Sequence, residues 1–405
     1  MTVLRPANAG EAEDMIGWAM AEKQPLEIVA GGSKRALGRP MRTDHILDLS
    51  ALRGIIDYEP AELVLTAKAA TPMAEIEAQL AAHSQMLAFE PPDWRILFGS
   101  GDEPTLGGAL ACNLAGPRRP RAGSARDFFL GFAAVNGRGE AWKAGGKVVK
   151  NVTGYDMCKL QAGAFGTLSL LTEVTLKVMP KPEASCTVIL SGLADEIAIP
   201  TLLGALNTPH EVSGAAHLPQ AAARRSSVEA VASGLGAVTA LRIEGPEPSV
   251  KDRVEAVEAM LGRGDRLDRT ASERFWSEAA SVVPLLDARG RIVWRLCPTP
   301  NQAPGVVHAI GGELHSAEAF YDWGGGLVWL TLDADEAGAD GGAGIVRGAL
   351  ARAGGHAMLV LAPEAVRAEV AVFEPRSAAI DSLERRIKQG FDPAGVLNPG
   401  RMWKV

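Results

Sequence analysis

The sequence predicts an α+β protein with an α/β region at 1–180 and a mixed α/β region, built on an antiparallel sheet, at 183–370. Three observations support this prediction. Strand and helix patterns alternate in the first 180 residues. The segment MPKP at 179–182 carries two prolines, which a central strand or helix does not tolerate. Beyond it, short apolar runs are separated by helical patterns, and 405 residues suffice for two or three domains.

The first helix is predicted from Asn8 and Glu11, which form a capping-box pattern. Its apolar face would contain Met15, Ile16 and Ala19. An apolar run at 26–30 then predicts a strand that leads into the sequence GGSK at 31–34. The first strand of the region therefore ends in a glycine loop.

A second strand is predicted at 63–69, followed by a helix with Thr71 as its cap and Pro72 at its first position. An irregular stretch at 90–104 precedes a second glycine run, TLGG at 105–108. A strand at 128–135 leads to Asn136 and Gly137, a typical hairpin turn. Residues 167–178 alternate between apolar and polar side chains, which predicts a half-buried strand.

The region 183–370 has weaker motifs. Its predicted strands are 187–190, 237–243, 292–296, 327–332 and 357–361, and its predicted helices are 250–261 and 345–353.

Composition excludes several classes of protein. The net charge of −7 argues against a nucleic-acid partner, which would require a basic surface. No apolar segment is long enough to span a membrane, and the polar, acidic start has no apolar run of the kind a signal peptide needs, so we expect none. The four cysteines form no CxxC pair, so they predict reduced thiols in a cytoplasmic protein and no zinc ribbon or iron–sulfur site.

Glycine loops between a strand and a helix can bring backbone N–H groups close to a phosphate. Either loop alone also fits an ordinary tight turn, but two loops in one α/β domain favour a dinucleotide. A P-loop is excluded because Val148 follows Lys147 where Ser or Thr is required. The sequence GAGIVRG at 342–348 lies far from the preceding strand, and we interpret it as a helix-entry loop.

The loops belong to a wider pattern. VAGGS at 29–33, PTLGG at 104–108 and GAFGTL at 163–168 occur in the order seen in vanillyl-alcohol-oxidase-type FAD domains, and FDPAGVLNPGR at 391–401 resembles their C-terminal signature. AGPRRP at 115–120 and VKNVTGYD at 149–156 resemble the FAD-binding E subunits of bacterial glycolate oxidases. The resemblance covers 1–180 and 375–405; the middle is matched mainly through 321–323 and 354–356.

This resemblance implies a PCMH-type FAD-binding domain of two α/β subdomains at 1–180, a cap domain at 183–370, and a segment at 375–405 that returns to the FAD domain. It also implies the residues that bind the cofactor. They are Ala30, Gly31, Gly32, Ser33, Lys34, Thr105, Leu106, Gly107, Gly108, Ala111, Asn113, Gly116, Gly163, Gly166, Thr167, Thr172 and Asn398.

Relatives that bond FAD covalently have His directly after the paired glycines and Cys shortly before the second loop. This chain has Ser33 and Glu103 at those places. We therefore expect FAD to be bound non-covalently.

The sequence gives fewer signals for the residues that would act on the substrate than for those that would bind FAD. Oxidation of a 2-hydroxy acid needs a base for the hydroxyl proton. The seven histidines form no closely spaced pair, so we expect no metal site and take His356 as the candidate base. The basic cluster that includes Arg118 and Arg119 fits a solvated or salt-bridged face, or a site for an anion; the resemblance favours the anion.

The resemblance implies a flavin subunit that helps to oxidise glycolate to glyoxylate and passes electrons to partners. These would be a sister FAD-binding D subunit and an iron–sulfur F subunit, with peripheral association at the inner face of the cell membrane through the complex. Two alternatives stay open: a self-sufficient FAD-dependent oxidoreductase of another hydroxy acid or an alcohol, and an assembly module whose flavin site has decayed.

Overall fold

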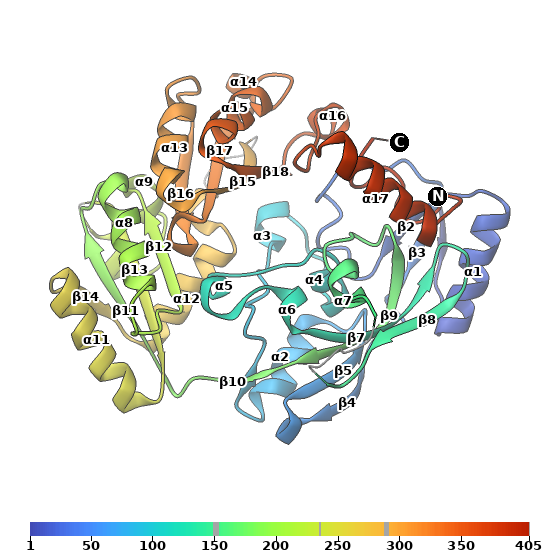
Figure 1. Ribbon diagram of the computed structural model, residues 1–405, viewed down its shortest axis with the longest axis horizontal. Helices are drawn as coiled ribbons and strands as arrows, with labels where there is room; N and C mark the ends of the chain where they lie inside the picture. The colour runs from blue at the N-terminus through green and yellow to red at the C-terminus, as the bar shows by residue number, and fades with distance from the viewer. Residues whose placement is uncertain (149–153, 235, 287–290, 405) are drawn as a thin grey trace.

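The computed structural model describes residues 1–148, 154–234, 236–286 and 291–404. Residues 149–153 of the VKNVTGYD motif lie outside the described residues. The chain forms two units that lie side by side (Figure 1). One unit contains both termini, a three-stranded sheet, a five-stranded sheet and a two-stranded ladder of β6 (Gln85–Met86) with β10 (Met179–Pro180), and the other contains the eight-stranded sheet, which we call the cap sheet.

The smaller sheet of the first unit is parallel, in the order β1-β3-β2. Its strands are β1 (Thr2–Leu4), β2 (Leu26–Val29) and β3 (His45–Asp48). Helix α1 (Ala9–Ala21) begins at Asn8, whose side chain accepts a hydrogen bond from the backbone N–H of Glu11 at 3.0 Å. The Glu11 carboxylate accepts from the N–H of Ala7, so the predicted cap of this helix is confirmed.

The larger sheet of the first unit is antiparallel, in the order β4-β5-β9-β7-β8. Its strands are β4 (Ile55–Glu59), β5 (Val64–Lys68), β7 (Phe129–Asn136), β8 (Ala141–Gly145) and β9 (Ser169–Lys177). The expectation of a half-buried strand at 167–178 is wrong. Strand β9 lies between β5 and β7 and packs against two hydrophobic cores, one through Leu170 and the other through Leu171.

Short helices connect these strands. They include α2 (Met73–Ala81), α3 (Arg95–Phe98), α4 (Leu106–Ala111), α5 (Arg119–Ala122), α6 (Ala125–Phe128) and α7 (Met157–Gln161). Thr71 does not cap α2 as expected. Its hydroxyl accepts from the N–H of Gly54 and donates to the carbonyl of Lys68 at 2.7 Å, so it fixes the preceding turn instead.

The cap sheet has the order β14-β11-β13-β12-β16-β17-β15-β18 and is antiparallel throughout, which confirms the predicted sheet type. Its strands are β11 (Ala184–Ser191), β12 (Gly214–Leu218), β13 (Val238–Gly245), β14 (Asp265–Leu267), β15 (Arg291–Pro298), β16 (Glu318–Asp322), β17 (Leu327–Asp333) and β18 (Gly355–Leu361). The sequence prediction missed β12, β14 and β16.

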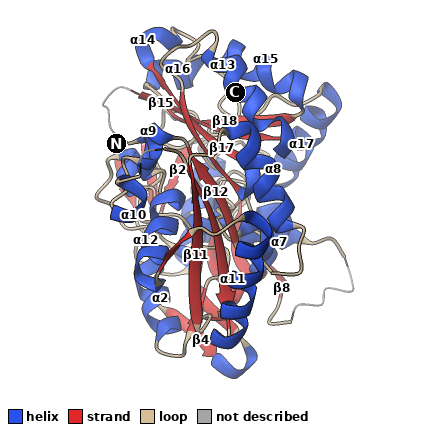
Figure 2. Ribbon diagram, turned by 90° about the vertical axis from the view of Figure 1, so that its left-hand side faces the viewer, coloured by secondary structure: helices blue, strands red, loops and turns tan. Residues whose placement is uncertain are grey.

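Helices α8 (Asp195–Leu206), α11 (Glu247–Leu261), α13 (Ala303–Gly311) and α15 (Ala343–Ala353) pack on one face of the cap sheet (Figure 2). The other face packs with α12 (Arg269–Ala280) and shares a hydrophobic core with the first unit. Side chains on this second face therefore point toward the first unit.

Four buried or half-buried charged residues join the two units. Arg118 binds both carboxylate oxygens of Glu244, at 2.9 and 2.8 Å, and contacts Glu90 at 2.9 Å. Arg242 also binds Glu90, at 2.8 and 2.9 Å. Burial alone would raise the pKa of Glu244, but Arg242 and Arg118 outweigh it and lower this pKa to about 2. We call these four residues the junction network.

The end of the chain returns to the first unit, where helix α17 (Ala378–Phe391) lies (Figure 1). The N–H of Leu26 donates to the carbonyl of Val396 at 2.8 Å, and the N–H of Asn398 donates to the carbonyl of Leu26 at 3.0 Å. Residues 391–401 are thus tied to β2. In the part of the chain that the structure describes, no helix is long and apolar enough to cross a membrane.

Candidate functional site

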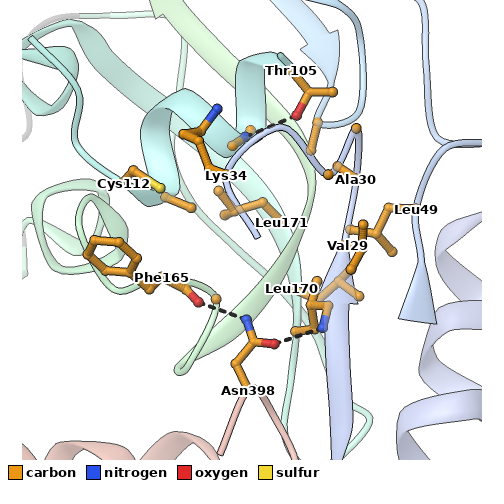
Figure 3. Close-up of a pocket in the computed structure, with 18 of the residues that line it drawn as sticks. Val29, Ala30, Lys34, Leu49, Thr105, Cys112, Phe165, Leu170, Leu171 and Asn398 are labelled. Carbon is orange, nitrogen blue, oxygen red and sulfur yellow. Dashed lines mark hydrogen bonds between the residues drawn. The ribbon is translucent and has the colours of Figure 1, made fainter. Parts of the chain in front are cut away.

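A cavity opens where β2 ends, with about 790 Å³ of space free of protein atoms, including the part open to solvent (Figure 3). Four segments far apart in the sequence form its walls: 28–35, 105–112, 165–171 and the C-terminal residues Asn398 and Arg401. The predicted cofactor residues that line it are Ala30, Gly31, Gly32, Ser33, Lys34, Thr105, Gly107, Gly108, Ala111, Gly166 and Asn398.

The first glycine loop has free backbone donors. In the described chain, no residue accepts a hydrogen bond from the backbone N–H groups of residues 31–34. A side chain at Gly31 would place its Cβ 1.7 Å from the carbonyl oxygen of Glu103, and Gly32 has a φ of +88°. Glycine is therefore required at both positions, and the loop presents a row of unpaired N–H groups.

In the second glycine run the backbone N–H groups of Leu106, Gly107 and Gly108 are occupied. The N–H groups of Leu106 and Gly107 donate to the carbonyls of Thr71 and Ala69, at 3.0 and 2.7 Å. The Thr105 hydroxyl accepts from the N–H of Gly108 at 3.3 Å (Figure 3). This segment gives the cavity a close-packed wall, because a Cβ at Gly107 would lie 2.8 Å from that of Ala69.

Asn398 joins three walls of the cavity. Its Oδ1 accepts a hydrogen bond from the N–H of Ile28 at 2.7 Å, and its Nδ2 donates to the carbonyl of Phe165 at 2.8 Å (Figure 3). A Cβ at Gly166, where φ is +68°, would lie 2.8 Å from the same Nδ2. Asn398 thus has a positioning role, since both of its polar atoms are paired.

Six of the predicted cofactor residues do not line the cavity, and their contacts place them behind its walls. Leu106 is fully buried. The Asn113 side chain accepts a hydrogen bond from the N–H of Arg126, and the Gly116 carbonyl accepts one from the Trp323 indole. The N–H of Gly163 donates to the carbonyl of Leu110, the Thr167 hydroxyl donates to the carbonyl of Ala164, and the Thr172 carbonyl accepts from the N–H of Ala69.

The cavity is cationic. No Asp or Glu lines it, whereas Lys34, Arg35 and Arg401 do. Arg35 pairs with Glu27, but neither Lys34 nor Arg401 forms an ion pair with any described residue. Burial lowers the pKa of both side chains, because desolvation disfavours a positive charge that lacks a counterion. Ser169 also lines the cavity, and its buried Oγ has no hydrogen-bond partner in the described residues. These three groups suit a buried anionic ligand that carries hydrogen-bonding atoms.

Sequence reasoning did not select Arg401 or Ser169. Arg401 ends the FDPAGVLNPGR signature, so the motif itself contained the signal. Ser169 is one of several polar residues in β9, and only the fold shows that it lines a cavity.

The three predicted substrate-side residues do not line the cavity. Arg118 belongs to the junction network, where two carboxylates occupy its guanidinium group. Arg119 is exposed and stacks on the ring of Trp323, with its Cζ 4.4 Å from the ring centroid. His356 is exposed on β18, where it is paired with Cys297 of β15. Among the described residues, no group of His, Cys, Asp and Glu could hold a metal ion.

The fold and the cavity define an FAD-linked oxidoreductase of the PCMH type. A family model for the FAD binding domain matches residues 2–145. The structure of p-cresol methylhydroxylase with substrate bound has the same fold, with a TM-score of 0.70, 12% identity, and coverage of 99% of this chain and 88% of that chain.

Curated relatives extend the match over the whole chain. The glycolate oxidase subunit GlcE of Escherichia coli (strain K12) is 35% identical over 395 residues, which are 96% of this chain and 96% of that protein. The glycolate oxidase subunit GlcD of Bacillus subtilis (strain 168) is 25% identical over 99% of this chain and 88% of its own. The chain belongs to the GlcE-type family of FAD-linked oxidoreductases, and its cofactor is FAD.

Proposed function

We propose that this chain is the FAD-binding subunit of a complex that oxidises glycolate, a small 2-hydroxy acid, to glyoxylate. The observation that carries the proposal is the end-to-end match to a glycolate oxidase subunit. The intact cationic cavity supports it, because a decayed flavin site would not keep buried cations without counterions.

The cavity residues fit FAD. The free N–H groups of residues 31–34, together with Lys34 and Arg401, would hold the diphosphate, and Ser169 would offer its hydroxyl to the cofactor. FAD, when bound, accepts the two electrons of the oxidation. We propose that 1–180 and 375–405 form the FAD-binding domain and 183–370 the cap, in keeping with the hydrogen bonds between Leu26 and residues 396 and 398.

We propose that FAD is held without a covalent bond. Ser33 and Glu103 replace the residues that would form one, and Glu103 is exposed outside the cavity. Cys112 does line the cavity, but burial raises the pKa of its thiol, so the nucleophilic thiolate is disfavoured.

The proposed partners are a sister FAD-binding D subunit and an iron–sulfur F subunit, which would take the electrons onward, with the complex in the cytoplasm or at the inner face of the cell membrane. The names of the relatives, both glycolate oxidase subunits, support this assignment. His356 is the proposed proton acceptor, because its imidazole is accessible on the face of the cap sheet that is turned toward the first unit.

The experiment is purification of the chain alone and with its D and F partners, followed by an assay of glycolate oxidation. We expect turnover in the complex and little in the isolated chain. Full turnover by the isolated chain would support the self-sufficient oxidoreductase, and a colourless chain that takes up no added FAD would support the decayed module.

Yellow colour released into the supernatant on denaturation would establish non-covalent FAD, and pellet-bound colour would refute it.

A further inference from the structure

Two arginines from different units meet on one tryptophan ring. Arg119 lies in α5 of the first unit, and Arg295 lies in β15 of the cap sheet. Their Cζ atoms are 4.4 and 5.1 Å from the ring centroid of Trp323. In the described part of the chain neither guanidinium group has an ion-pair or hydrogen-bond partner, so the N–H edges of both groups are free.

The backbone is held in a costly conformation to place this ring. Trp323 has a φ of +54°, which is uncommon for a bulky side chain. The Asp322 carboxylate accepts from the N–H of Trp323 at 2.7 Å, and the indole Nε1 donates to the carbonyl of Gly116 at 3.0 Å. Strain that the surroundings maintain in this way is typical of functional sites.

The face of the cap sheet around Arg295 is positive. On β15, Trp294 and Leu296 point into the helix-covered core, so Arg295 and Cys297 point to the opposite face, toward the first unit. His356 is paired with Cys297 on the neighbouring strand β18. Burial would raise the pKa of the Cys297 thiol, but Arg295, His356 and Arg119 together lower it, as a local positive field requires.

Two stretches of chain connect this positive face with the walls of the FAD cavity. Strand β18 bonds to the segment that follows it, through the N–H of Leu359 and the carbonyl of Val372. The next residue, Phe373, packs edge-on against Phe165 of the cavity wall, with ring centroids 4.9 Å apart. On the other side, Gly116 lies four residues after Cys112, which also lines the cavity. The loop that bears Gly116 and the segment that bears Phe373 therefore join the surroundings of the two arginines to the walls of the cavity.

We propose that Arg119 and Arg295, both in contact with the ring of Trp323, form the subsite that binds the carboxylate of the substrate. The inference rests on the proposed oxidation of a 2-hydroxy acid and names the residues that would select for it. A carboxylate between the two guanidinium groups would neutralise two like charges that otherwise repel each other. Because one arginine comes from each unit, the subsite exists only when the two units of the chain are packed against each other.

The test uses the purified, FAD-loaded full chain and oxalate, a small carboxylate that cannot undergo this oxidation. Calorimetric titration at low salt is expected to show binding to the wild type. Arg119→Gln and Arg295→Gln should each weaken binding by about 10- to 100-fold, since each removes a charge-assisted contact. The matched control is Arg138→Gln, which removes an exposed arginine from the β7–β8 turn and should leave the affinity within about twofold.

Melting temperature and flavin content, measured for every variant, show whether each is folded. Arg119 is exposed, so its variant is expected to fold as the wild type does. Absence of oxalate binding to the wild type, equal affinity in the double variant, or an equal loss in Arg138→Gln would each overturn the subsite.

Turnover by the assembled complex separates the two proposals. If the complex oxidises glycolate and the double variant keeps the wild-type KM, the proposed function stands and the subsite fails. If no 2-hydroxy acid is oxidised but oxalate binding is lost in the two arginine variants, the carboxylate subsite stands and the proposed function fails.

Discussion

Arg118 and Arg119 are adjacent in sequence and lie in opposite electrostatic surroundings. Arg118 belongs to the junction network, in which two arginines and two glutamates pair fully and Arg242 is 3% exposed. Arg119 has no carboxylate partner in the described chain, and the same holds for Lys34 and Arg401 in the FAD cavity. Paired charges hold the two units together, whereas unpaired charges leave room for a ligand.

The largest expected effect is that of Gly31→Ala on the cavity. The new Cβ would lie 1.7 Å from the carbonyl oxygen of Glu103, so the loop must move and its free N–H groups must lose their alignment. We expect FAD affinity to fall by at least about 100-fold, the loss of roughly two charge-assisted hydrogen bonds. The ratio of flavin to protein absorbance after gel filtration measures it.

The control for this variant is Gly101→Ala, in the loop that packs against Gly31. A Cβ at Gly101 would have no atom within 4 Å. Normal flavin content is expected in this control. A flavin-replete Gly31→Ala protein would show that the free N–H groups do not hold the cofactor.

The second prediction concerns the stability of the variant Glu244→Gln, which removes one carboxylate from the junction network. The substitution leaves Arg118 and Arg242 with one negative partner in place of two, so we expect the free energy of unfolding to fall by about 2–4 kcal/mol. Chemical denaturation monitored by tryptophan fluorescence measures this change. Flavin affinity should be unaltered, because the network does not line the cavity.

This effect depends on pH in a defined direction. The pKa of Glu244 falls from 4.5 to about 2 in the folded protein, so its stabilisation is present above pH 4.5 and is lost as the pH falls toward 2. The wild type and Glu244→Gln should therefore converge in stability in acid. Glu211→Gln is the control: Glu211 pairs with Arg121 and, at 3.6 Å, with Arg253, but 53% of its own side chain is exposed, so its loss should cost less than about 1 kcal/mol.

The third prediction concerns FAD affinity in the cavity variant Lys34→Met. Methionine keeps a buried aliphatic side chain of similar length and removes the positive charge. We therefore expect FAD to bind about 10- to 100-fold more weakly, and the flavin-free protein to be no less stable than the wild type. Fluorescence titration of the flavin-free protein measures the affinity. Lys143→Met, an exposed lysine on β8, should bind FAD as the wild type does. Equal losses in both variants would point to a general charge effect.

The smallest effect is expected from Ser169→Ala. Its buried hydroxyl has no partner in the described chain, so its removal should leave the flavin-free protein equally or slightly more stable. FAD affinity should fall by about two- to tenfold, the loss of one neutral hydrogen bond. Stability and affinity would change in opposite directions, and a parallel loss of both would contradict a role in binding.

The sequence predicted the position of the glycine loops, because a turn with positive φ or close backbone contact requires glycine locally. It did not distinguish the two loops. The free donors of residues 31–34 and the occupied donors of Leu106 and Gly107 differ only through partners at Thr71 and Ala69, which the fold brings close. The same limit applies to Arg118, whose partners Glu90 and Glu244 are 28 and 126 residues away.

The fold class was predicted from alternation and turn residues, and the antiparallel cap sheet was confirmed. Strands β12 and β16 were missed because they are short and buried on both faces, so they lack an alternating pattern. Ser169 and Arg295 carry no local signal of function, because their roles depend on which face of a sheet they occupy.

The hydrogen bonds of Asn398 also bear on how the protein is made. The cavity lacks one wall until Asn398 has bonded to Ile28 of β2 and to Phe165, and Arg401 has bonded to the carbonyl of Arg35. A chain cut before Asn398 is therefore expected to lack a closed cavity and to retain little flavin.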